Sequence, residues 1–400
     1  MAQNIVTGID VGDYAIKIVV AGYDKQGSLP RILSVVKRES EGFRRGIVTD
    51  SEEATKSIKR AIQASEKTIG QRIKKAYISI GGAGLSSQIT DGGMMIAGSD
   101  QEVSDSDIKQ ALEKAEQKID GRNNLTIHSV YPLTYKLDGK KITGTPKGMR
   151  GTKLEVKTLF ITSITQSYEE VVSAVEHAGI TVLHVYPSPL AASLVTLSKT
   201  QRVAGCVLAD IGGETTTIGV FEEGRPYLIE NIELGSQDVT NDIALGLKID
   251  LEEAEQIKRG SHANTLAQKK LVEIIGARLS DIFELIEDKL NTIGRNELLP
   301  AGVVIIGGGA YIPQIVPLAS AGLNLPARVA SPLYPHHIKI DELNEKEASS
   351  IIIKDPSYAV AYGLVIFGMD PGKDDRMWKG RPFKNDSFGK VSKWFKNFIP

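Results

Sequence analysis

Apolar and polar residues alternate along most of the chain with the periods of strands and helices. Apolar runs at 5–11 and 15–22 are separated only by Gly12-Asp13, which predicts a strand, a tight turn and a second strand. Apolar residues at 51–68 recur at helical spacing and predict a helix, with Ser51 as its N-terminal cap. Further strands are expected at 32–38 and 76–80. This order of elements predicts an α/β fold.

The opening pattern returns about 200 residues later. Strands are expected at 203–211 and 216–221, and Asp210 precedes the glycine turn between them as Asp10 precedes the first turn. This weak repetition predicts two similar domains that face each other. A third apolar strand, 303–306, runs into three successive glycines.

The pattern differs between the repeats, from about 84 to 162. A glycine-rich stretch there is followed by a predicted helix at 105–119 and by strands at 130–137 and 151–162. This block is expected to be a small α+β unit inserted into the larger α/β fold. Other helices are predicted at 168–178, 188–198, 238–245, 251–258, 266–291 and 358–368.

Composition and charge are those of a folded protein without an electrostatic preference for nucleic acid. The chain has 400 residues, 41% of them hydrophobic, and a formal net charge of −1. Cys206 is its single cysteine, so no intramolecular disulfide can form and a reducing compartment is favoured. No apolar stretch reaches the roughly 18 residues that span a bilayer. Any membrane contact is therefore expected to be peripheral.

Three glycine turns, each directly after an apolar strand, are the candidate chemistry. Glycine lets backbone N–H groups approach a polyphosphate closely, and a preceding carboxylate suits Mg²⁺. Asp10 and Asp210 hold equivalent places in the repeats, so both are expected to face one metal–phosphate centre. Each turn taken alone is better explained as a structural turn than as a phosphate site. The order and spacing of all three favour a nucleotide site.

These segments resemble the actin-like ATPase superfamily. GIDVGDYAIKIVV is similar to its first phosphate loop, LADIGGETTTIGVF to its second and VVIIGGGAYIP to its adenosine loop. AEQIK at 254–258 resembles a helix whose Glu and Lys flank the adenosine. The resemblance implies two RNase H-like domains facing a cleft for ATP and Mg²⁺. It implies metal contacts from Asp10 and Asp210, and nucleotide contacts from Asp10, Gly12, Asp13, Tyr14, Lys17, Asp210, Gly212, Gly213, Glu214, Thr215, Thr216, Glu255, Lys258, Gly308, Gly309 and Ala310.

Several positions depart from that superfamily. Asp13 places a negative charge beside the expected phosphate, and Glu214 replaces a common glycine. Ser188 stands where the MreB proteins have a glutamate that positions the attacking water, and its hydroxyl is no base unaided. Slow hydrolysis is therefore expected, and no catalytic residue is assigned. Glu255 and Lys258 are alternatively an exposed ion pair.

The inserted block and three further segments resemble the FtsA family of bacterial cell-division proteins. These segments are SEGFRRGIVTD at 40–50, ELGSQDVTNDIALGL at 233–247 and VEIIGARLSDIFELIEDKL at 272–290. The resemblance implies a protein that forms filaments with itself, tethers filaments of FtsZ to the membrane and meets other divisome proteins through 84–162. Arg278 and Asp281 match positions that contact the FtsZ tail, although an ordinary surface pair is equally expected there.

The resemblance also implies a division of the chain. Domain 1A is expected at 1–83 and 163–199 with 355–369 returning to it, subdomain 1C at 84–162, domain 2A at 200–245 and 300–354, and subdomain 2B at 246–299. Residues 370–387, rich in charge, proline and glycine, are expected to be a flexible linker.

The last segment, 388–400, has the pattern of an amphipathic helix. On a helix the apolar residues fall largely on one side and three lysines on the other. Apolar and aromatic residues opposite lysine are typical of a helix lying in the headgroup plane of anionic lipid. The residues expected at the membrane are Phe388, Val391, Trp394, Phe395, Phe398, Ile399, Lys390, Lys393 and Lys396. Docking on a protein surface is the alternative.

The leading hypothesis is thus a structural protein at the division site, on the cytoplasmic face of the cell membrane, with no nucleic-acid partner. One alternative is a pilus-assembly protein like PilM, which shares the insertion but is expected to lack the amphipathic tail. A second, from a different class, is a sugar kinase or a chaperone-type ATPase. A kinase needs a base aimed at a substrate hydroxyl, and the sequence offers none.

Overall fold

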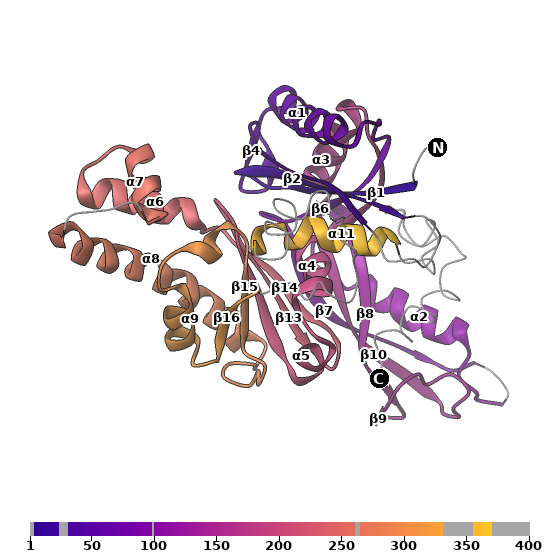
Figure 1. The fold of residues 1–400 in the computed structure, drawn as a ribbon. Coiled ribbons are helices and arrows are strands. Elements are labelled where there is room, and N and C mark those ends of the chain that lie inside the picture. Colours follow the sequence, from indigo (N-terminus) through magenta and orange to yellow (C-terminus); the bar gives the residue numbers. More distant parts are fainter. Residues whose placement is uncertain (1–3, 24–30, 98–99, 261–264, 331–354, 370–400) are drawn as a thin grey trace.

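The computed structural model describes residues 4–23, 31–97, 100–260, 265–330 and 355–369. These residues form two five-stranded sheets, one four-stranded sheet and a two-stranded hairpin, with helices packed on the faces of the large sheets (Figure 1). The expected linker at 370–387 and the expected helix at 388–400 lie outside the described residues.

The first sheet has the strand order β11-β6-β1-β2-β3. β1 runs antiparallel to β2 and parallel to β6. Helices α1 (Ser51–Ile69) and α3 (Thr165–His177) cover one face, and α4 (Ser188–Thr196) and α11 (Ala359–Met369) lie on the other. The strands are β1 (Asn4–Val11), β2 (Ala15–Tyr23), β3 (Arg31–Glu39), β6 (Lys75–Ile80) and β11 (Thr181–Pro187).

The second sheet repeats this topology, in the order β14-β13-β12-β15-β16. β12 is antiparallel to β13 and parallel to β15, as β1 is to β2 and β6. The structure therefore confirms the predicted repeat and the actin-like fold. The strands are β12 (Cys206–Ile211), β13 (Thr216–Glu222), β14 (Arg225–Ile232), β15 (Val303–Ile306) and β16 (Ala327–Val329). Helices α6 (Ser236–Leu247), α7 (Leu251–Lys258), α8 (Thr265–Thr292) and α9 (Ile315–Leu323) belong to this half.

The alternation of side chains along β12 explains how the two halves join. Cys206 and Leu208 point into a core shared with α4, α11 and the first sheet. Val207, Ala209 and Ile211 point the other way, into a core formed with α6, α8 and α9. Both faces of the sheet are buried, and the side chains of this strand are therefore almost all apolar.

Helices α4 and α11 cross between the two large sheets with almost no space between their backbones. A Cβ atom at Gly363 of α11 would lie 2.0 Å from the carbonyl oxygen of Ala191 in α4. Gly8 of β1 is equally close to α11, since a Cβ atom there would lie 2.3 Å from the carbonyl oxygen of Ala361. These glycines permit backbone contact, so no larger side chain fits at either position.

The third sheet is antiparallel, in the order β7-β10-β8-β9. Helix α2 (Asp105–Glu116) covers one of its faces, with a small core of its own. Arg225 of β14 donates hydrogen bonds of 2.7 Å to the carbonyl oxygens of Pro132 and Leu133 and so ties this sheet to the second one. The strands are β7 (Ser86–Met95), β8 (Leu125–Leu137), β9 (Lys140–Ile142) and β10 (Lys153–Ile164).

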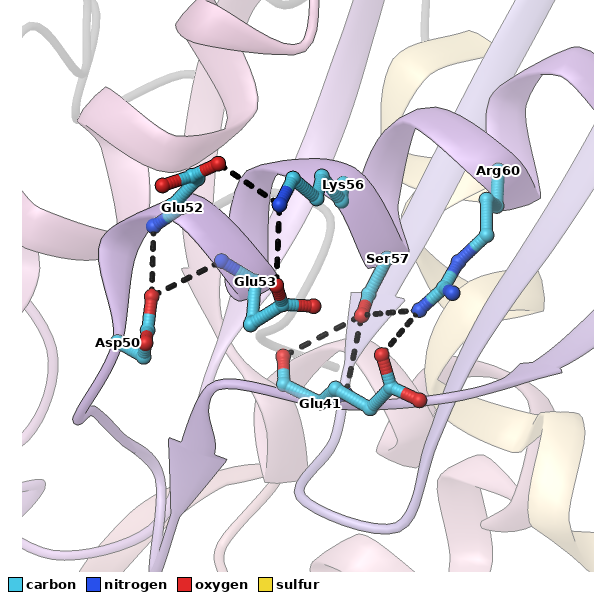
Figure 2. Close-up of polar contacts among 7 residues, drawn as sticks. All are labelled: Glu41, Asp50, Glu52, Glu53, Lys56, Ser57 and Arg60. Carbon is cyan, nitrogen blue, oxygen red and sulfur yellow. Dashed lines mark hydrogen bonds and ion pairs between the residues drawn. The ribbon is translucent and has the colours of Figure 1, made fainter.

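Some predicted elements were wrong or missed. Asp50, not Ser51, caps α1, because its carboxylate accepts hydrogen bonds of 3.0 Å from the N–H groups of Glu52 and Glu53 (Figure 2). Residues 203–204 end a short helix, α5 (Lys199–Ala204), rather than begin a strand. Strands β7 and β14 were not predicted.

Candidate functional site

A cavity of about 480 Å³ lies where the two halves meet. The turns after β1 and β12 enter it from opposite sides, since both strands end at equivalent places in their sheets. The structure brings most of the predicted nucleotide residues to its wall. These are Asp10, Gly12, Asp13, Tyr14, Lys17, Asp210, Gly212, Gly213, Thr215, Glu255, Lys258 and Gly308.

The remaining predicted residues are near the cavity but outside its lining. Thr216 is fully buried, and its hydroxyl donates to the carbonyl oxygen of Leu234. Gly309 packs on Ile211, where a Cβ atom would lie 2.4 Å from a methyl carbon, and Ala310 is also buried. Glu214 accepts a hydrogen bond from another loop, described below. The structure thus brings all three predicted loops to the cavity, while Glu214, Thr216, Gly309 and Ala310 lie outside its lining.

Asp10 is held at the cavity wall by two side chains. Ser79 of β6 donates a hydrogen bond of 2.8 Å to Asp10 Oδ1, and Lys17 Nζ lies 3.0 Å from Asp10 Oδ2. Burial alone would lower the pKa of Lys17, but the carboxylates of Asp10 and Asp210 together raise it. The ammonium group of Lys17 is therefore fixed and charged between the two aspartates.

Asp210 occupies the equivalent position of the second sheet. It pairs in register with Thr217, as Asp10 pairs with Lys17, so a single lysine serves both repeats. Burial, with a smaller contribution from Asp10, raises the pKa of Asp210 to about 7. A cation bound here would lower that pKa again, because it favours the charged carboxylate.

The glycine turn after β15 fits closely against Asp210. Gly307 has φ +86°, and a Cβ atom there would lie 2.4 Å from Asp210 Oδ1. A Cβ atom at the next residue, Gly308, would meet no protein atom within 4 Å. Gly308 thus leaves an open surface in the cavity wall, against which a flat ring can pack.

Glu255 and Lys258 form a largely buried pair, not the exposed one that was the alternative. Lys258 Nζ lies 2.6 Å from Glu255 Oε2, with 7% of the lysine side chain exposed. Lys258 also donates to the carbonyl oxygen of Ser236 at 2.9 Å and to the hydroxyl of Thr240 at 2.7 Å. Burial lowers the pKa of Lys258. These bonds fix the pair at the cavity wall.

The two acidic departures from the superfamily pattern turn toward one hairpin. β4 (Phe43–Arg44) and β5 (Ile47–Val48) form this hairpin, and its turn is Arg45-Gly46. The N–H of Gly46 donates to Asp13 Oδ1 at 2.5 Å, and the N–H of Arg45 donates to Glu214 Oε2 at 2.8 Å. Burial raises the pKa of Asp13 to about 6.

The sequence did not single out several other residues of the wall. Lys37 pairs in register with Lys17, and burial followed by repulsion from Lys17 lowers its pKa. Arg259 donates to the hydroxyl of Tyr14 across the cavity at 3.1 Å. The further lining residues include Ser79, Gly81, Gly82, Gln237 and Tyr311. Lys37 could have been found from the sequence, because it is a charged residue in a strand expected to lie beside the strand of Lys17.

Ser188 lines the cavity beside Gly81 and Thr217. A Cβ atom at Gly81 would lie 2.8 Å from Ser188 Oγ and 3.9 Å from Thr217 Oγ1. Ser188 and Thr217 therefore present hydroxyl groups at the place where the superfamily resemblance predicts a base for the attacking water.

Arg278 and Asp281 lie far along α8, outside the cavity lining. Arg278 Nη1 is 3.1 Å from Asp281 Oδ2, the predicted i, i+3 pair. The same guanidinium also makes two hydrogen bonds to Asp242 of α6, at 2.7 and 3.2 Å. The arginine therefore links α6 to α8 and leaves part of its charge at the surface.

The residues present fit a magnesium–nucleotide complex better than a bare metal. Among the described residues, no group of three or more His, Cys, Asp and Glu is placed to hold a metal ion. Two aspartates alone suit Mg²⁺ when phosphate oxygens and waters complete its shell. The backbone N–H groups of the glycine turns and the ammonium of Lys17 offer complementary charge for those phosphates.

Comparison with known proteins agrees with this arrangement. The family model described as "Cell division protein FtsA" matches residues 207–363, and that described as "SHS2 domain inserted in FTSA" matches residues 82–162. Cell division protein FtsA of Bacillus subtilis (strain 168) is 31% identical over 387 residues, which cover 91% of this chain and 83% of that protein. The chain belongs to the FtsA family. The FtsA of Borreliella burgdorferi is 29% identical, with 99% of each chain covered.

Solved structures show that this FtsA has the actin-like fold. The PilM–PilN type IV pilus biogenesis complex matches with a TM-score of 0.69 at 18% identity, covering 92% of this chain and 100% of that one. MreB5 of Spiroplasma citri bound to ADP matches with a TM-score of 0.51 at 13% identity, covering 91% and 96%. At these identities the likeness concerns the fold alone. Family membership and fold together describe a cell-division protein with an actin-like fold.

In the part of this FtsA that the structure describes, no helix combines the length and apolar character needed to cross a bilayer.

Proposed function

We propose that this FtsA binds ATP with Mg²⁺ in the cavity and tethers FtsZ filaments to the cytoplasmic face of the membrane. The observation that carries the nucleotide part is the symmetry of the cavity. Asp10 and Asp210 end equivalent strands, line the same wall and share Lys17. A fixed lysine ammonium between two metal-preferring carboxylates, with glycine turns on both sides, suits a polyphosphate with its Mg²⁺.

Each group has a distinct part in this proposal. Lys17 and the turns at Gly12 and Gly212 would bind the phosphates, and Asp10 and Asp210 would hold the metal. The Glu255–Lys258 pair and the open face of Gly308 position the adenosine. Bound Mg²⁺ neutralises phosphate charge and favours the ionised form of Asp210. Because Ser188 is not a base, we expect bound nucleotide to be hydrolysed slowly.

A cavity-filling variant tests the nucleotide site. Gly308→Val should abolish Mg-ATP binding in a calorimetric titration, because its side chain would enter the cavity without meeting a protein atom. Gly276→Val on α8 is the matched control, since a Cβ atom there also meets nothing within 4 Å but lies outside the cavity. Equal binding by both variants, or no binding by the unaltered protein, would contradict the proposal.

The FtsZ tail is proposed to bind beside Arg278 and Asp281 on α8. The substitution Arg278→Glu would place a third carboxylate beside those of Asp242 and Asp281 and disturb the contact between α6 and α8. The double variant Arg278→Gln, Asp242→Asn removes the charges of the pair and keeps hydrogen-bonding groups in place. It should lose binding of an acidic FtsZ tail peptide.

Arg295 and Glu222 supply the matched control for this surface. They form a similarly exposed ion pair of 2.8 Å elsewhere, so Arg295→Gln, Glu222→Gln should bind the peptide normally. Retained binding by the Arg278 variant would place the FtsZ contact at another site. Self-association into filaments, and contacts of 84–162 with other divisome proteins, complete the proposed role.

A further inference from the structure

The hairpin formed by β4 and β5 connects the two halves of the molecule at the phosphate end of the cavity. Gly46 at its turn lines the cavity. From the first half, Asp13 accepts the N–H of Gly46 at 2.5 Å. From the second half, Glu214 accepts the N–H of Arg45 at 2.8 Å, and Glu233 pairs with the Arg45 guanidinium at 2.8 Å. Two successive backbone N–H groups thus bind one acid from each phosphate loop.

The base of this hairpin is fixed to the first half. Figure 2 shows Glu41, two residues before β4, held by Ser57 and Arg60 of α1. The N–H of Glu41 donates to Ser57 Oγ at 3.0 Å, and Arg60 Nη2 lies 2.5 Å from Glu41 Oε2. After the second strand of the hairpin, Asp50 caps the N-terminus of the same helix, α1.

The turn of the hairpin has a conformation that supports these contacts. Arg45 and Gly46 both have positive φ, +50° and +79°. Gly46 packs so tightly on Gly82 that a Cβ atom there would lie 2.6 Å from its Cα. The carbonyl oxygen of Arg45 also accepts the N–H of Ala83 at 2.7 Å. A rigid turn of this kind presents both N–H groups in a fixed direction.

We propose that this hairpin is a clasp on the nucleotide cavity, in which Arg45 bridges to Glu214 and Glu233 and slows the release of bound nucleotide. The inference deepens the proposed function and rests on it. The clasp is anchored on the first half, so only its contacts to the second half must break when the cavity opens. It also gives Asp13 and Glu214 a role: their carboxylates bind the clasp instead of facing the phosphates.

The test measures dissociation of a fluorescent ATP analogue with Mg²⁺ after chasing with unlabelled ATP. Arg45→Ala and Glu233→Ala should each speed dissociation by about two- to fivefold, the range expected for an exposed ion pair. Arg44→Ala, the exposed neighbour in the same hairpin, is the matched control and should leave the rate unchanged. The charge-exchanged double variant Arg45→Glu, Glu233→Arg should restore slow dissociation.

The salt dependence of nucleotide dissociation provides a second test. A residue that only supports the fold would not change this dependence. Both side chains of the pair are about half exposed, 48% and 56%, so their attraction is screened. The rate of the unaltered protein should therefore approach that of Arg45→Ala as salt rises. The clasp is overturned if nucleotide binds but Arg45→Ala, Glu233→Ala and Arg44→Ala all release it at the original rate.

A measurement without nucleotide separates this inference from the proposed function. Glu214→Ala removes the acceptor of the Arg45 N–H, so amide hydrogen exchange of residues 43–48 should accelerate in the ligand-free protein. If no nucleotide binds, the proposed function fails, and exchange still reports on the clasp. Unchanged exchange in Glu214→Ala would show that the bridge to the second half does not form.

Discussion

His128 should make the protein less stable in mild acid. Its ring is buried where β8 meets β10 and α3, lies 2.7 Å from Ser163 Oγ and packs on the ring of Tyr168. Burial lowers the pKa of His128 to about 4. An unfolded chain has a histidine pKa of about 6.5. Between these values the unfolded state binds more protons, so stability is full above about pH 6.5 and falls as the pH decreases.

The size of this effect follows from the two pKa values. At pH 5 about 97% of unfolded but only about 9% of folded molecules carry the proton on this ring, which corresponds to a loss of about 2 kcal/mol. Asp13 and Asp210 act in the opposite direction, since their raised pKa values make the folded state bind protons in the same range. The total pH dependence of the protein therefore does not isolate His128.

A neutral substitution isolates it. His128→Gln keeps a hydrogen-bonding group near Ser163 but cannot gain a proton, so its urea unfolding should lose about 2 kcal/mol less than the unaltered protein between pH 7.5 and pH 5. His177→Gln is the control, because His177 is exposed and also contacts a serine hydroxyl, Ser173 Oγ, at 3.1 Å. Equal pH dependence for His128→Gln and the unaltered protein would refute the reasoning.

Three further predictions concern function. Deleting 388–400 should release the protein from anionic liposomes in a flotation assay while Mg-ATP binding is kept; Trp394→Glu should act alike, and continued flotation would favour docking on a protein. Steady-state phosphate release should remain far below the roughly 10 per second of typical enzymes, because Ser188 cannot act as a base. A rate near that value would mean that another side chain, such as a carboxylate, activates the attacking water. Gly307→Ala should weaken Mg-ATP binding and lower the melting temperature, since its φ is +86° and its Cβ would meet Asp210; unchanged calorimetry and melting would contradict this contact.

The sequence predicted the architecture well because the fold is encoded twice. Asp10 and Asp210 follow similar strands, and the two sheets have the same order and direction of strands. Strand β7 was missed because it contains Gly92 and Gly93, and glycine is rare in strands. In the structure Gly92 lies under α2, where a Cβ atom would lie 1.9 Å from the carbonyl oxygen of Ala111. Composition alone does not distinguish a glycine that turns the chain from one that lets a helix approach.

The cavity was predictable in its loops but not in its cross-links. From the sequence, Asp13 and Glu214 look unfavourable beside a phosphate. Their hydrogen-bond donors are the backbone N–H groups of Gly46 and Arg45, and a backbone N–H has no sequence signature. Side-chain partners from distant strands, such as Ser79 for Asp10, were likewise invisible. Contacts between residues far apart in the chain depend on the packing of the sheets, which local patterns do not report.

The crossing of α4 and α11 limits how the molecule can change shape. Because Gly363 and Ala191 meet backbone to backbone, the two helices are in main-chain contact at their crossing. The crossing therefore leaves no room for a side chain, and it fixes the spacing between the two large sheets that lie on either side of it. A methyl group at Gly363 would push the two helices apart, and the two sheets would have to separate with them.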